Sequence, residues 1–505
     1  MPRVLPRRTT RTTLTAASSS LALILALAAC GSQLDPAEVA AGQGAVPDVA
    51  GTAVGSTPTG IEDDGVVDPA APEGAAPGMP GTPGADVPGT TGDTPLDTPA
   101  GEIPKSAGPD GPSDTPTPAP PGGDVEAASC EGFRNGPGIT DSTITIANAS
   151  DISGPVPGLF EASRQGTQAF IAYFNSTEKL CGRSLSYLPL DSRADAGGDQ
   201  QAYARACDEA FAVVGSTSSQ DSGGAGTAQS CGIPDIRAFS VTPDRQGCST
   251  CFAAYSISSS QISDAIPKFW LQKEPDASQH VAIFYVNVSA ASINAESFAS
   301  AYNKAGMNVD VLQGIDTSEF NFAPYVQQMK DNDIDFVQYF GPYQFAVKLQ
   351  QAMQQQGFEP SVYLEDPTIY DANYIKQAGS LADGVYVYSP IQLLDDTSIP
   401  EMALYRSWLD QVSPGAVPNY YGLFAWSAAR LFVEQATKLG GKLDRASLVA
   451  ALAQVKGWTG NGVHAPMAVG AKTTSPCAKI IQYDGSAWKQ VSPGDFMCGK
   501  LISTG

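Results

Sequence analysis

The sequence predicts an α/β fold of two doubly wound lobes, each built on a parallel sheet, preceded by a long segment that does not fold. From residue 142 onward, short apolar runs alternate with stretches of helical periodicity, and this alternation restarts after Cys251. The strand-like runs are apolar throughout, which is typical of parallel sheets covered by helices on both faces. Residues 31–128, in contrast, are rich in proline and glycine and contain no aromatic residue.

The first thirty residues have the pattern of an export signal. Met1–Thr13 contains four arginines and no acid, and residues 14–29 are small and apolar. The ending Leu27-Ala28-Ala29-Cys30 resembles the lipobox of bacterial lipoproteins, so residues 1–29 are expected to be a signal peptide and Cys30 the acylated anchor. An ordinary signal peptide with an incidental cysteine is the alternative, and Arg7-Arg8 leaves both the Sec and the twin-arginine routes open.

Residues 30–128 are expected to form a disordered, acidic linker rich in proline and glycine. They hold one base, Lys105, against 16 acids, and they cannot bury enough apolar surface to fold. The prolines favour an extended spacer that holds the folded part away from the membrane. The formal charge of −23, with no basic stripe, argues against nucleic acid or an anionic membrane surface as a partner. The lipid is therefore the expected membrane contact.

The other eight cysteines indicate disulfides in an oxidising compartment. The Cys248-Ser-Thr-Cys251 segment has the spacing of a redox motif but lacks the thioredoxin-like strand and helix around it, so a structural clip is favoured. Eight cysteines allow many connectivities, and the sequence does not choose among them. The expected pairs are Cys130–Cys181, Cys207–Cys231, Cys248–Cys251 and Cys477–Cys498.

The expected elements follow from the periodicity of the apolar residues. The strands are placed at 143–149, 185–190, 211–215, 236–239, 280–286, 307–312, 334–340, 361–365, 384–390, 478–483 and 488–491. Between them the helices include 262–271, 290–305, 322–329 and 345–353, followed by a mainly helical region at 402–412, 420–439 and 445–455.

The stretch 211–242 is the candidate binding site. Its first strand stops at Gly215, and small hydroxyl residues and glycines follow before an expected helix, while the next strand leads into Ser240 and Thr242. Unpaired N–H groups at a helix start, together with hydroxyls, can receive a carboxylate. The ends of adjacent parallel strands meet in one crevice, which is where such sheets bind ligands.

Enzyme motifs are not found in the sequence. His280 and His464 are far apart, no zinc-binding helix motif or P-loop occurs, and Gly223–Gly226 lacks the dinucleotide spacing. Ser176–Lys179 matches Ser-x-x-Lys without the companion motifs of penicillin-interacting enzymes. The chain is therefore expected not to be an enzyme and to need no cofactor or metal.

Three parts of the chain resemble the solute-binding proteins of ABC importers for leucine, isoleucine and valine, which have the type I periplasmic-binding-protein fold. The resemblance covers about residues 138–491, and it rests on 152–156, on 314–343, and on 462–472 with 482–491. Lipobox and linker add a likeness to tethered actinobacterial forms. The family implies two lobes joined by three hinge crossings, expected near 256–260, 389–392 and 459–464. The first lobe would comprise 130–258 and 391–460, and the second 259–390 and 461–505.

The resemblance also implies a ligand site. The family holds the ligand carboxylate at positions matching Ser218, Ser219 and Thr242, and the ammonium at Tyr343 and at Glu365 or Asp366. Phe160 is the aromatic candidate after Pro157, while Ser289–Ala291 replaces an aromatic residue of the family. Capping and turn roles are the alternatives for these polar residues.

The implied function is a monomeric, lipid-anchored receptor on the extracytoplasmic face of the cell membrane. It would bind an amino acid or a related small amide or acid and deliver it to an ABC permease. A tethered ligand sensor or cell-surface scaffold with no transport role is the alternative.

Overall fold

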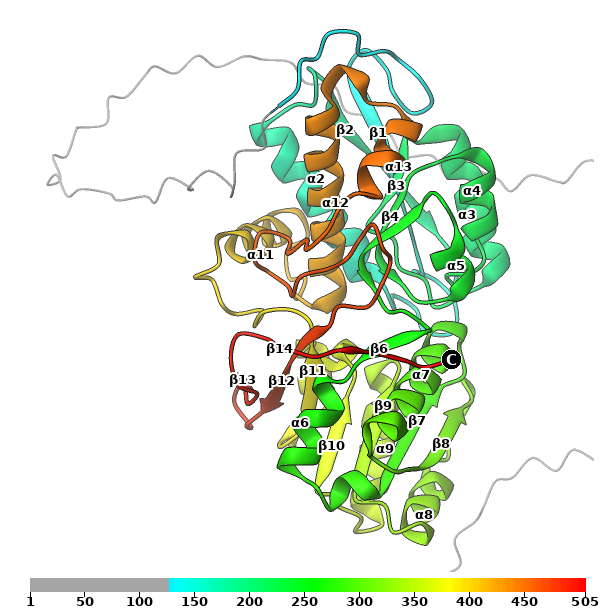
Figure 1. The fold of residues 1–505 in the computed structure, drawn as a ribbon, viewed down its shortest axis with the longest axis vertical. Coiled ribbons are helices and arrows are strands. Elements are labelled where there is room, and N and C mark those ends of the chain that lie inside the picture. Colours follow the sequence, from blue (N-terminus) through cyan, green and yellow to red (C-terminus); the bar gives the residue numbers. More distant parts are fainter. Residues whose placement is uncertain (1–126) are drawn as a thin grey trace, which may run out of the picture. The chain divides into compact units, whose positions relative to one another are not determined.

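The computed structural model describes residues 127–505, which form two lobes (Figure 1). The expected signal peptide, the lipid anchor Cys30 and the linker up to residue 126 lie outside the described residues. Within 127–505, no helix combines the length and the apolar character needed to cross a bilayer.

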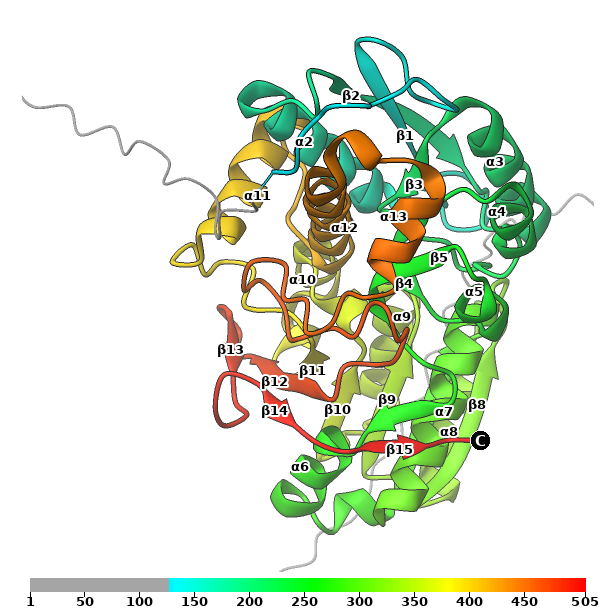
Figure 2. The ribbon, with the colours of Figure 1, turned by 45° about the horizontal axis from the view of Figure 1, so that its top comes forward.

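The first lobe is a five-stranded parallel sheet with the order β2-β1-β3-β4-β5. Helices from the start of the region and from near its end cover the sheet, and α12 packs against both α2 and β4 (Figure 2). The elements are β1 (Thr143–Ser150), α2 (Glu161–Thr177), β2 (Ser184–Asp191), α3 (Ala196–Glu209), β3 (Ala212–Val214), α4 (Ala225–Cys231), β4 (Asp235–Ser240), α5 (Pro243–Gly247), β5 (Cys251–Ser256), α11 (Pro400–Val412), α12 (Tyr420–Leu439), η5 (Gly440–Lys442) and α13 (Arg445–Leu452).

The second lobe has a parallel core, β11-β10-β9-β7-β8, extended by the antiparallel strands β12 and β13. Two short strands, β14 and β15, pair with β12 and β6. The elements are β6 (Gln261–Ser263), α6 (Ala265–Lys273), η2 (Ala277–Gln279), β7 (Val281–Val286), α7 (Ser289–Ala305), β8 (Val309–Ile315), α8 (Ala323–Asp331), β9 (Phe336–Phe340), α9 (Tyr343–Gln355), β10 (Val362–Glu365), η3 (Pro367–Ile369), α10 (Ala372–Ala378), η4 (Gly379–Ala382), β11 (Tyr386–Ser389), β12 (Cys477–Tyr483), β13 (Trp488–Gln490), β14 (Met497–Cys498) and β15 (Leu501–Ser503).

The α/β fold class with parallel sheets in two lobes is confirmed, and the differences are local. Strand β5 was not expected, although its six residues are all buried as in its neighbours. The helix expected at 262–271 begins only at Ala265, because 261–263 forms β6 and pairs with β15 near the end of the chain. A pairing over that separation leaves no periodic signal in the local sequence.

Three passages of chain join the lobes: 257–260, 390–399 and 453–476. The second and third run side by side, since Gln392 N donates to Val463 O at 2.9 Å and Ala465 N donates to Pro390 O at 2.8 Å. The first contacts the third through Ser258 N, which donates to Thr474 Oγ1 at 2.6 Å. The first two crossings fall in the regions expected from the sequence.

The third crossing lies later than the expected 459–464. His464 contacts α12 of the first lobe, with its Nε2 2.8 Å from Ser427 Oγ, and burial lowers its pKa to about 4, so the ring is neutral at pH 7. Lys472 also stays with the first lobe, because its Nζ donates to Cys248 O at 2.5 Å. The return to the second lobe therefore occurs near residue 474, and not near 461 as expected.

Four disulfides stabilise the two lobes. They join Cys130 to Cys181, Cys207 to Cys231, Cys248 to Cys251 and Cys477 to Cys498, which are the same pairs expected from the sequence. The first three lie in the first lobe and the fourth ties β12 to β14 in the second. Cys248 and Cys251 are buried, which agrees with a structural clip.

Candidate functional site

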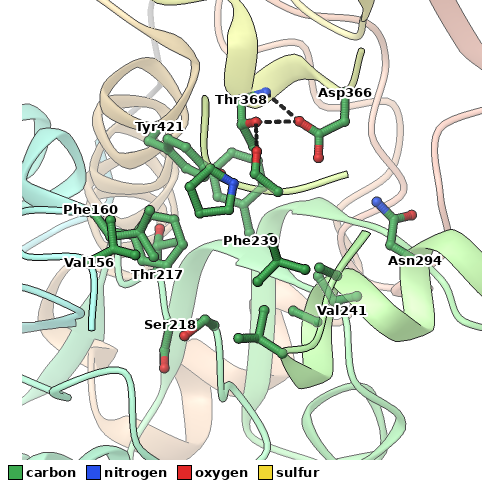
Figure 3. Close-up of a pocket in the computed structure, with 18 of the residues that line it drawn as sticks. Val156, Phe160, Thr217, Ser218, Phe239, Val241, Asn294, Asp366, Thr368 and Tyr421 are labelled. Atoms are coloured by element: carbon green, nitrogen blue, oxygen red, sulfur yellow. Dashed lines mark hydrogen bonds between the residues drawn. The ribbon is translucent and has the colours of Figure 1, made fainter. Parts of the chain in front are cut away.

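A cavity of about 140 Å³ lies between the lobes, at the carboxyl ends of both parallel sheets (Figure 3). The first lobe contributes the segments that follow β1, β3, β4 and β5, together with the start of α12. The second lobe contributes the segments after β7, β8, β9 and β10 and one residue of β11. This edge is where open α/β sheets place their ligands, and here two such edges face one another.

The walls of the cavity are mainly apolar and aromatic. Phe160 packs against Tyr421 in a tilted arrangement, with ring centroids 4.7 Å apart, and the centroid of the Phe239 ring lies 5.2 Å from that of Tyr421. The apolar and aromatic lining residues are Pro155, Val156, Leu159, Phe160, Phe239, Val241, Ile257, Val286, Val288, Pro342, Pro367, Tyr388, Tyr420 and Tyr421, and the small ones are Ala194, Ala290, Ala291 and Gly341. The polar lining residues are Thr217, Ser218, Ser219, Asn294, Thr317, Asp366 and Thr368.

The lobes touch on both sides of this region. Ala290 N, at the start of α7, donates to Ser219 O at 3.3 Å. Elsewhere Asn419 Nδ2, which caps α12, donates to Asp371 Oδ2 at 2.9 Å. These two hydrogen bonds join the lobes directly, beside the three connecting passages of chain.

Ser219 lines the cavity, but its hydrogen-bond donors are already used. Its backbone N and its Oγ each donate to Asp151 Oδ2 at 2.7 Å. The other Asp151 oxygen accepts from Ser192 Oγ at 2.6 Å. Asp151 directly follows β1, so a carboxylate of the chain itself occupies the donors that the resemblance assigned to a ligand.

Ser218 retains a free hydroxyl hydrogen. Its Oγ accepts from Gln220 N at 3.2 Å, and its side chain is directed to the cavity between the two lobes (Figure 3). Thr217, which precedes it, is held by a 2.8 Å hydrogen bond to Ser163 of α2. Ser218 is thus the hydroxyl of this turn that remains able to donate to a ligand.

Thr242 lies outside the cavity lining, contrary to the expectation from the sequence. It is the N-cap of α5, where its Oγ1 accepts from Arg245 N at 3.4 Å. Asp221 accepts from the backbone N of both Val241 and Thr242. The chain's own Asp221 therefore occupies the backbone donors at this strand end, and the capping alternative describes Thr242.

Tyr343 does not line this cavity either. It is the first residue of α9 and faces a second cavity of about 300 Å³, which shares Leu159, Pro342, Thr368 and Tyr421 with the first. This adjoining cavity is lined by more polar groups, including Glu161, Gln165, Gln344, Asp371, Asn373 and Asn419. Tyr343 is therefore placed beside the apolar cavity and not in it.

Glu365 and Asp366, which the sequence did not separate, have different positions. Glu365 is the last residue of β10, is 0% exposed and does not line the cavity. Neither of its carboxyl oxygens accepts a hydrogen bond from the described residues. Burial raises the pKa of Glu365 well above its ordinary value and so favours the protonated form, and the nearby Tyr363 hydroxyl acts in the opposite direction.

Asp366 faces the cavity. Its Oδ1 accepts from Thr368 N at 2.8 Å and from Thr368 Oγ1 at 2.5 Å, and Figure 3 shows the second oxygen pointing away from Thr368 into the pocket. Its side chain is 7% exposed. Burial raises the pKa of Asp366 to about 7, while the bonds from Thr368 act in the opposite direction.

Sequence reasoning missed Asp151 and Asn294 as site residues. Asp151 was detectable, because it follows the strand 143–150 as Ser216–Ser219 follow the strand 212–214. Asn294 lies one turn into α7, on the side of the helix that faces the cavity, and no local pattern marks it. Its Oδ1 and the Tyr388 hydroxyl are buried without a hydrogen-bond partner among the described residues.

A closed cavity between the carboxyl edges of two parallel sheets defines the class of two-lobed ligand receptors. The family model described as periplasmic binding protein matches residues 143–486, and the chain belongs to that family. No curated protein shows significant sequence similarity to the chain.

Solved structures with the same fold are similar in shape and distant in sequence. The isoleucine-bound branched-chain amino acid binding protein LivJ of Streptococcus pneumoniae is 17% identical, covering 70% of this chain and 100% of that one, with a TM-score of 0.59. A fatty acid ABC transporter substrate-binding protein of Thermomonospora curvata is 18% identical, covering 72% of this chain and 95% of that one, with a TM-score of 0.62. A solute-binding protein of R. palustris in complex with 4-hydroxybenzoate is 17% identical, covering 72% of this chain and 96% of that one, with a TM-score of 0.58. They support the fold expected from the resemblance.

Proposed function

We propose that the chain is a monomeric, lipid-anchored solute-binding protein on the extracytoplasmic face of the membrane, which delivers a small solute to an ABC permease. The observation that supports this most is the cavity between the lobes, with apolar walls and a few polar groups. Cavities of this make-up hold the apolar body of a ligand by burial and orient it by hydrogen bonds. The solute is therefore a small molecule with an apolar body, a class that includes amino-acid derivatives.

Closure couples binding to delivery. A ligand that contacts both lobes stabilises only the closed arrangement, in which Ala290 N reaches Ser219 O. The three crossings provide the hinge, and the buried neutral His464 packs there against Phe424, with ring centroids 5.1 Å apart. A permease would then distinguish the loaded receptor by the spacing of its lobes.

The proposal includes no catalytic step. No histidine, cysteine, lysine or arginine lines the cavity in residues 127–505, so a nucleophile with its base is not at hand there. Within the same residues, no group of three or more metal-ligating side chains occurs. The polar groups of the cavity suit recognition of a solute that leaves unchanged.

The test is calorimetric binding to the full chain with its cysteines oxidised, using a panel of amino acids, amides, amines, alcohols and small acids. Phe160→Ala removes an aromatic wall and is expected to weaken the best ligand by about tenfold, since burying a ring contributes about 1.5–3 kcal/mol. Phe133→Ala, which removes a partly buried ring distant from the cavity lining, is the matched control. If no compound binds the folded chain, the alternative function, a tethered sensor or cell-surface scaffold with no transport role, replaces the proposed solute-binding function.

A further inference from the structure

We propose that the solute is a protonated amine with an apolar body and no carboxylate, because Asp151 occupies the donors of Ser219 and the free carboxylate oxygen of Asp366 faces the cavity. This inference rests on the proposed function and specifies its ligand. Three observations carry it: the Asp151 contacts, the charge of the lining, and the position of Asp366.

The carboxylate of Asp151 accepts the hydrogen bonds from Ser219 that the carboxylate of an amino-acid ligand would otherwise accept. It is 0% exposed and takes both donors of Ser219, at 2.7 Å each, and the Ser192 hydroxyl, at 2.6 Å. A second carboxylate next to these oxygens would repel Asp151 and find no N–H free at Ser219. Ser219 therefore offers no free donor to a ligand carboxylate, and the Ser218 hydroxyl next to it is an uncharged donor.

No positive charge compensates elsewhere. The lining of the cavity and of the adjoining cavity contains Asp366, Glu161 and Asp371, and in neither lining does the described chain place a lysine, arginine or histidine. Burying an anion beside these acids would leave its charge unpaired, which costs several kcal/mol by order of magnitude. The same arrangement attracts a cation.

Asp366 is placed to receive that cation. Its side chain is more than nine-tenths buried, and one oxygen is fixed by Thr368 while the other points into the pocket (Figure 3). The rings of Tyr388, Tyr420 and Tyr421 line the same space, and aromatic faces favour cations. The free hydroxyl of Ser218, across the cavity, suits an uncharged second group such as an alcohol or amide oxygen.

Binding of an amine should strengthen as pH rises, since an ammonium pairs only with the ionised form of Asp366. The titratable groups facing Asp366 are Glu365 on its own strand and the tyrosines of β5, β9, β11 and α12, namely Tyr255, Tyr339, Tyr388, Tyr420 and Tyr421. Burial raises the pKa of each, so all stay neutral near pH 7. With a pKa of about 7 for Asp366, affinity should rise about thirtyfold between pH 5.5 and 8.

The experiment compares ligands that share one branched skeleton, by calorimetry on the full oxidised chain. Leucinol, leucinamide and 3-methylbutylamine carry an amine without a carboxylate, leucine carries both, 4-methylpentanoate carries only the carboxylate and 3-methylbutan-1-ol carries neither. The three amines should bind at least about tenfold more tightly than leucine, since one repelled charge is a difference of at least about 1.4 kcal/mol. Asp366→Asn should abolish the advantage of the three amines over 3-methylbutan-1-ol and the pH dependence, and Glu365→Gln should keep both.

A reversed specificity can also be sought with Asp151→Ala, which frees the donors of Ser219 and should raise the affinity for leucine relative to leucinol. If that variant does not fold, the ligand series on the wild-type chain still decides. Binding of leucine or 4-methylpentanoate as tight as that of the amines overturns the inference and leaves the solute-binding function intact. Equal binding of 3-methylbutan-1-ol and the amines overturns the charge assignment, and no binding by any compound of the wider panel overturns both proposals.

Discussion

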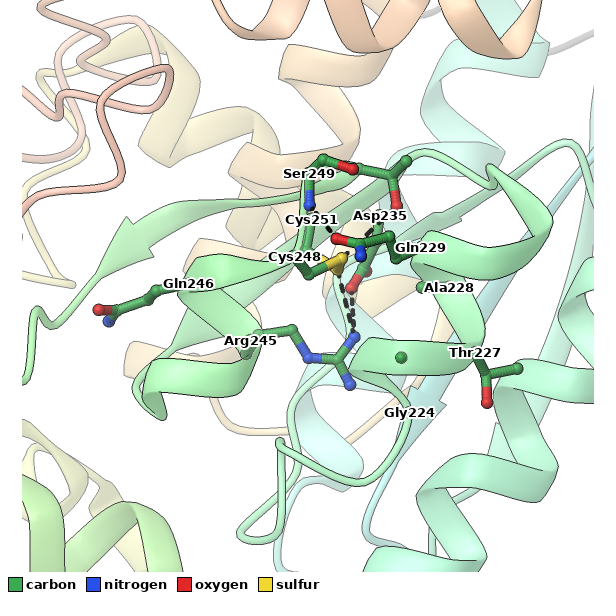
Figure 4. The surroundings of a disulfide bond; sticks show 12 residues. Gly224, Thr227, Ala228, Gln229, Asp235, Arg245, Gln246, Cys248, Ser249 and Cys251 are labelled. Carbon is green, nitrogen blue, oxygen red and sulfur yellow. Dashed lines mark hydrogen bonds and ion pairs between the residues drawn. A yellow bond between two sulfur atoms is a disulfide. The ribbon is translucent and has the colours of Figure 1, made fainter.

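The two lobes bury their acidic side chains in opposite ways. In the first lobe, Arg245 donates to Asp199 Oδ2 and to Asp235 Oδ2, each at 2.9 Å, with all three side chains 0% exposed (Figure 4). A second buried arginine, Arg237, donates to the Tyr203 hydroxyl, which in turn donates to Asp235. In the second lobe, Glu365 and Asp366 are adjacent and buried, and no described cation pairs with either of them.

Asp199 and Asp235 of the first lobe have structural partners within the fold, whereas Asp366 of the second lobe has no cation partner and lines the cavity. Burial raises the pKa of Asp199 to about 6, but the adjacent arginines keep it ionised at pH 7 and the charges are satisfied within the fold. The same burial leaves Asp366 with a pKa of about 7, because it is opposed only by hydrogen bonds from Thr368 and from the backbone of Gly341 and by no cation. The first set holds α4 and α5 to the sheet, while the second has unused charge at the cavity.

The largest effect should follow from breaking the compensated set. Arg245→Met leaves Asp199 and Asp235 buried without their direct partner and should lower the free energy of unfolding by about 5 kcal/mol. Chemical denaturation of the oxidised chain measures it. Arg205→Met, which removes an exposed and solvent-screened pair with Glu209, is the control and should leave the free energy of unfolding nearly unchanged. Equal losses in the two variants would remove the distinction between the lobes.

Asp366, which has no cation partner, predicts a variant that is more stable than the wild type at high pH, whereas Arg245→Met is expected to be less stable. Because the folded-state pKa of Asp366 is raised from 3.8 to about 7, its contribution to stability is fully present below the unfolded value and is lost as pH rises through 7. Asp366→Asn should therefore gain about 4 kcal/mol relative to wild type between pH 3.5 and 8. Denaturation curves at both pH values measure this change, and a constant difference would show that Asp366 is not held in a raised-pKa environment.

Most of the fold could be predicted because parallel strands buried on both faces are continuous apolar runs. Strand β5 escaped because its run, CFAAYS, begins at a cysteine assigned to a short disulfide loop. The strand β6 escaped because its partner is β15, more than two hundred residues away. Such pairings depend on the tertiary fold, and local periodicity does not carry them.

The site could be predicted in its location and not in its chemistry. The rule that ligands lie at the carboxyl ends of strands pointed to the turn with Ser218 and Ser219, and the family resemblance implied Glu365 or Asp366, of which Asp366 lines the cavity. Which donors remain free there depends on neighbours brought in by other strands, and Asp151 from β1 uses those of Ser219. Whether an acid at a strand end points inward, as Glu365 does, or toward the cleft, as Asp366 does, depends on the alternation along β10.

A smaller loss of stability is expected from removing the disulfide next to Arg245. The Cys248–Cys251 disulfide closes a short loop next to the guanidinium, and Arg245 Nη1 lies 3.7 Å from Cys251 Sγ (Figure 4). Replacing both cysteines by serine should lower the free energy of unfolding by about 2 kcal/mol, the value expected for closing so short a loop. Thermal and chemical unfolding measure this. A loss as large as that of Arg245→Met would mean that the disulfide, and not the ion pairs, holds the buried acids of the first lobe.

The smallest effect should come from Glu365→Gln, and it separates the two acids of the second lobe. Burial disfavours the charged form of Glu365 and the residue lies outside the cavity lining, so an amide of the same shape should change the affinity for the best ligand by less than about twofold, or about 0.4 kcal/mol. Asp366→Asn, one residue along the chain, should remove the affinity for amines. Because Glu365 resists ionisation in the fold, its replacement should also raise stability at pH 8 relative to pH 4, by the same sign argument as for Asp366. A loss of binding in Glu365→Gln that matches the loss in Asp366→Asn would show that the buried pair acts as one unit, with its charge shared across β10.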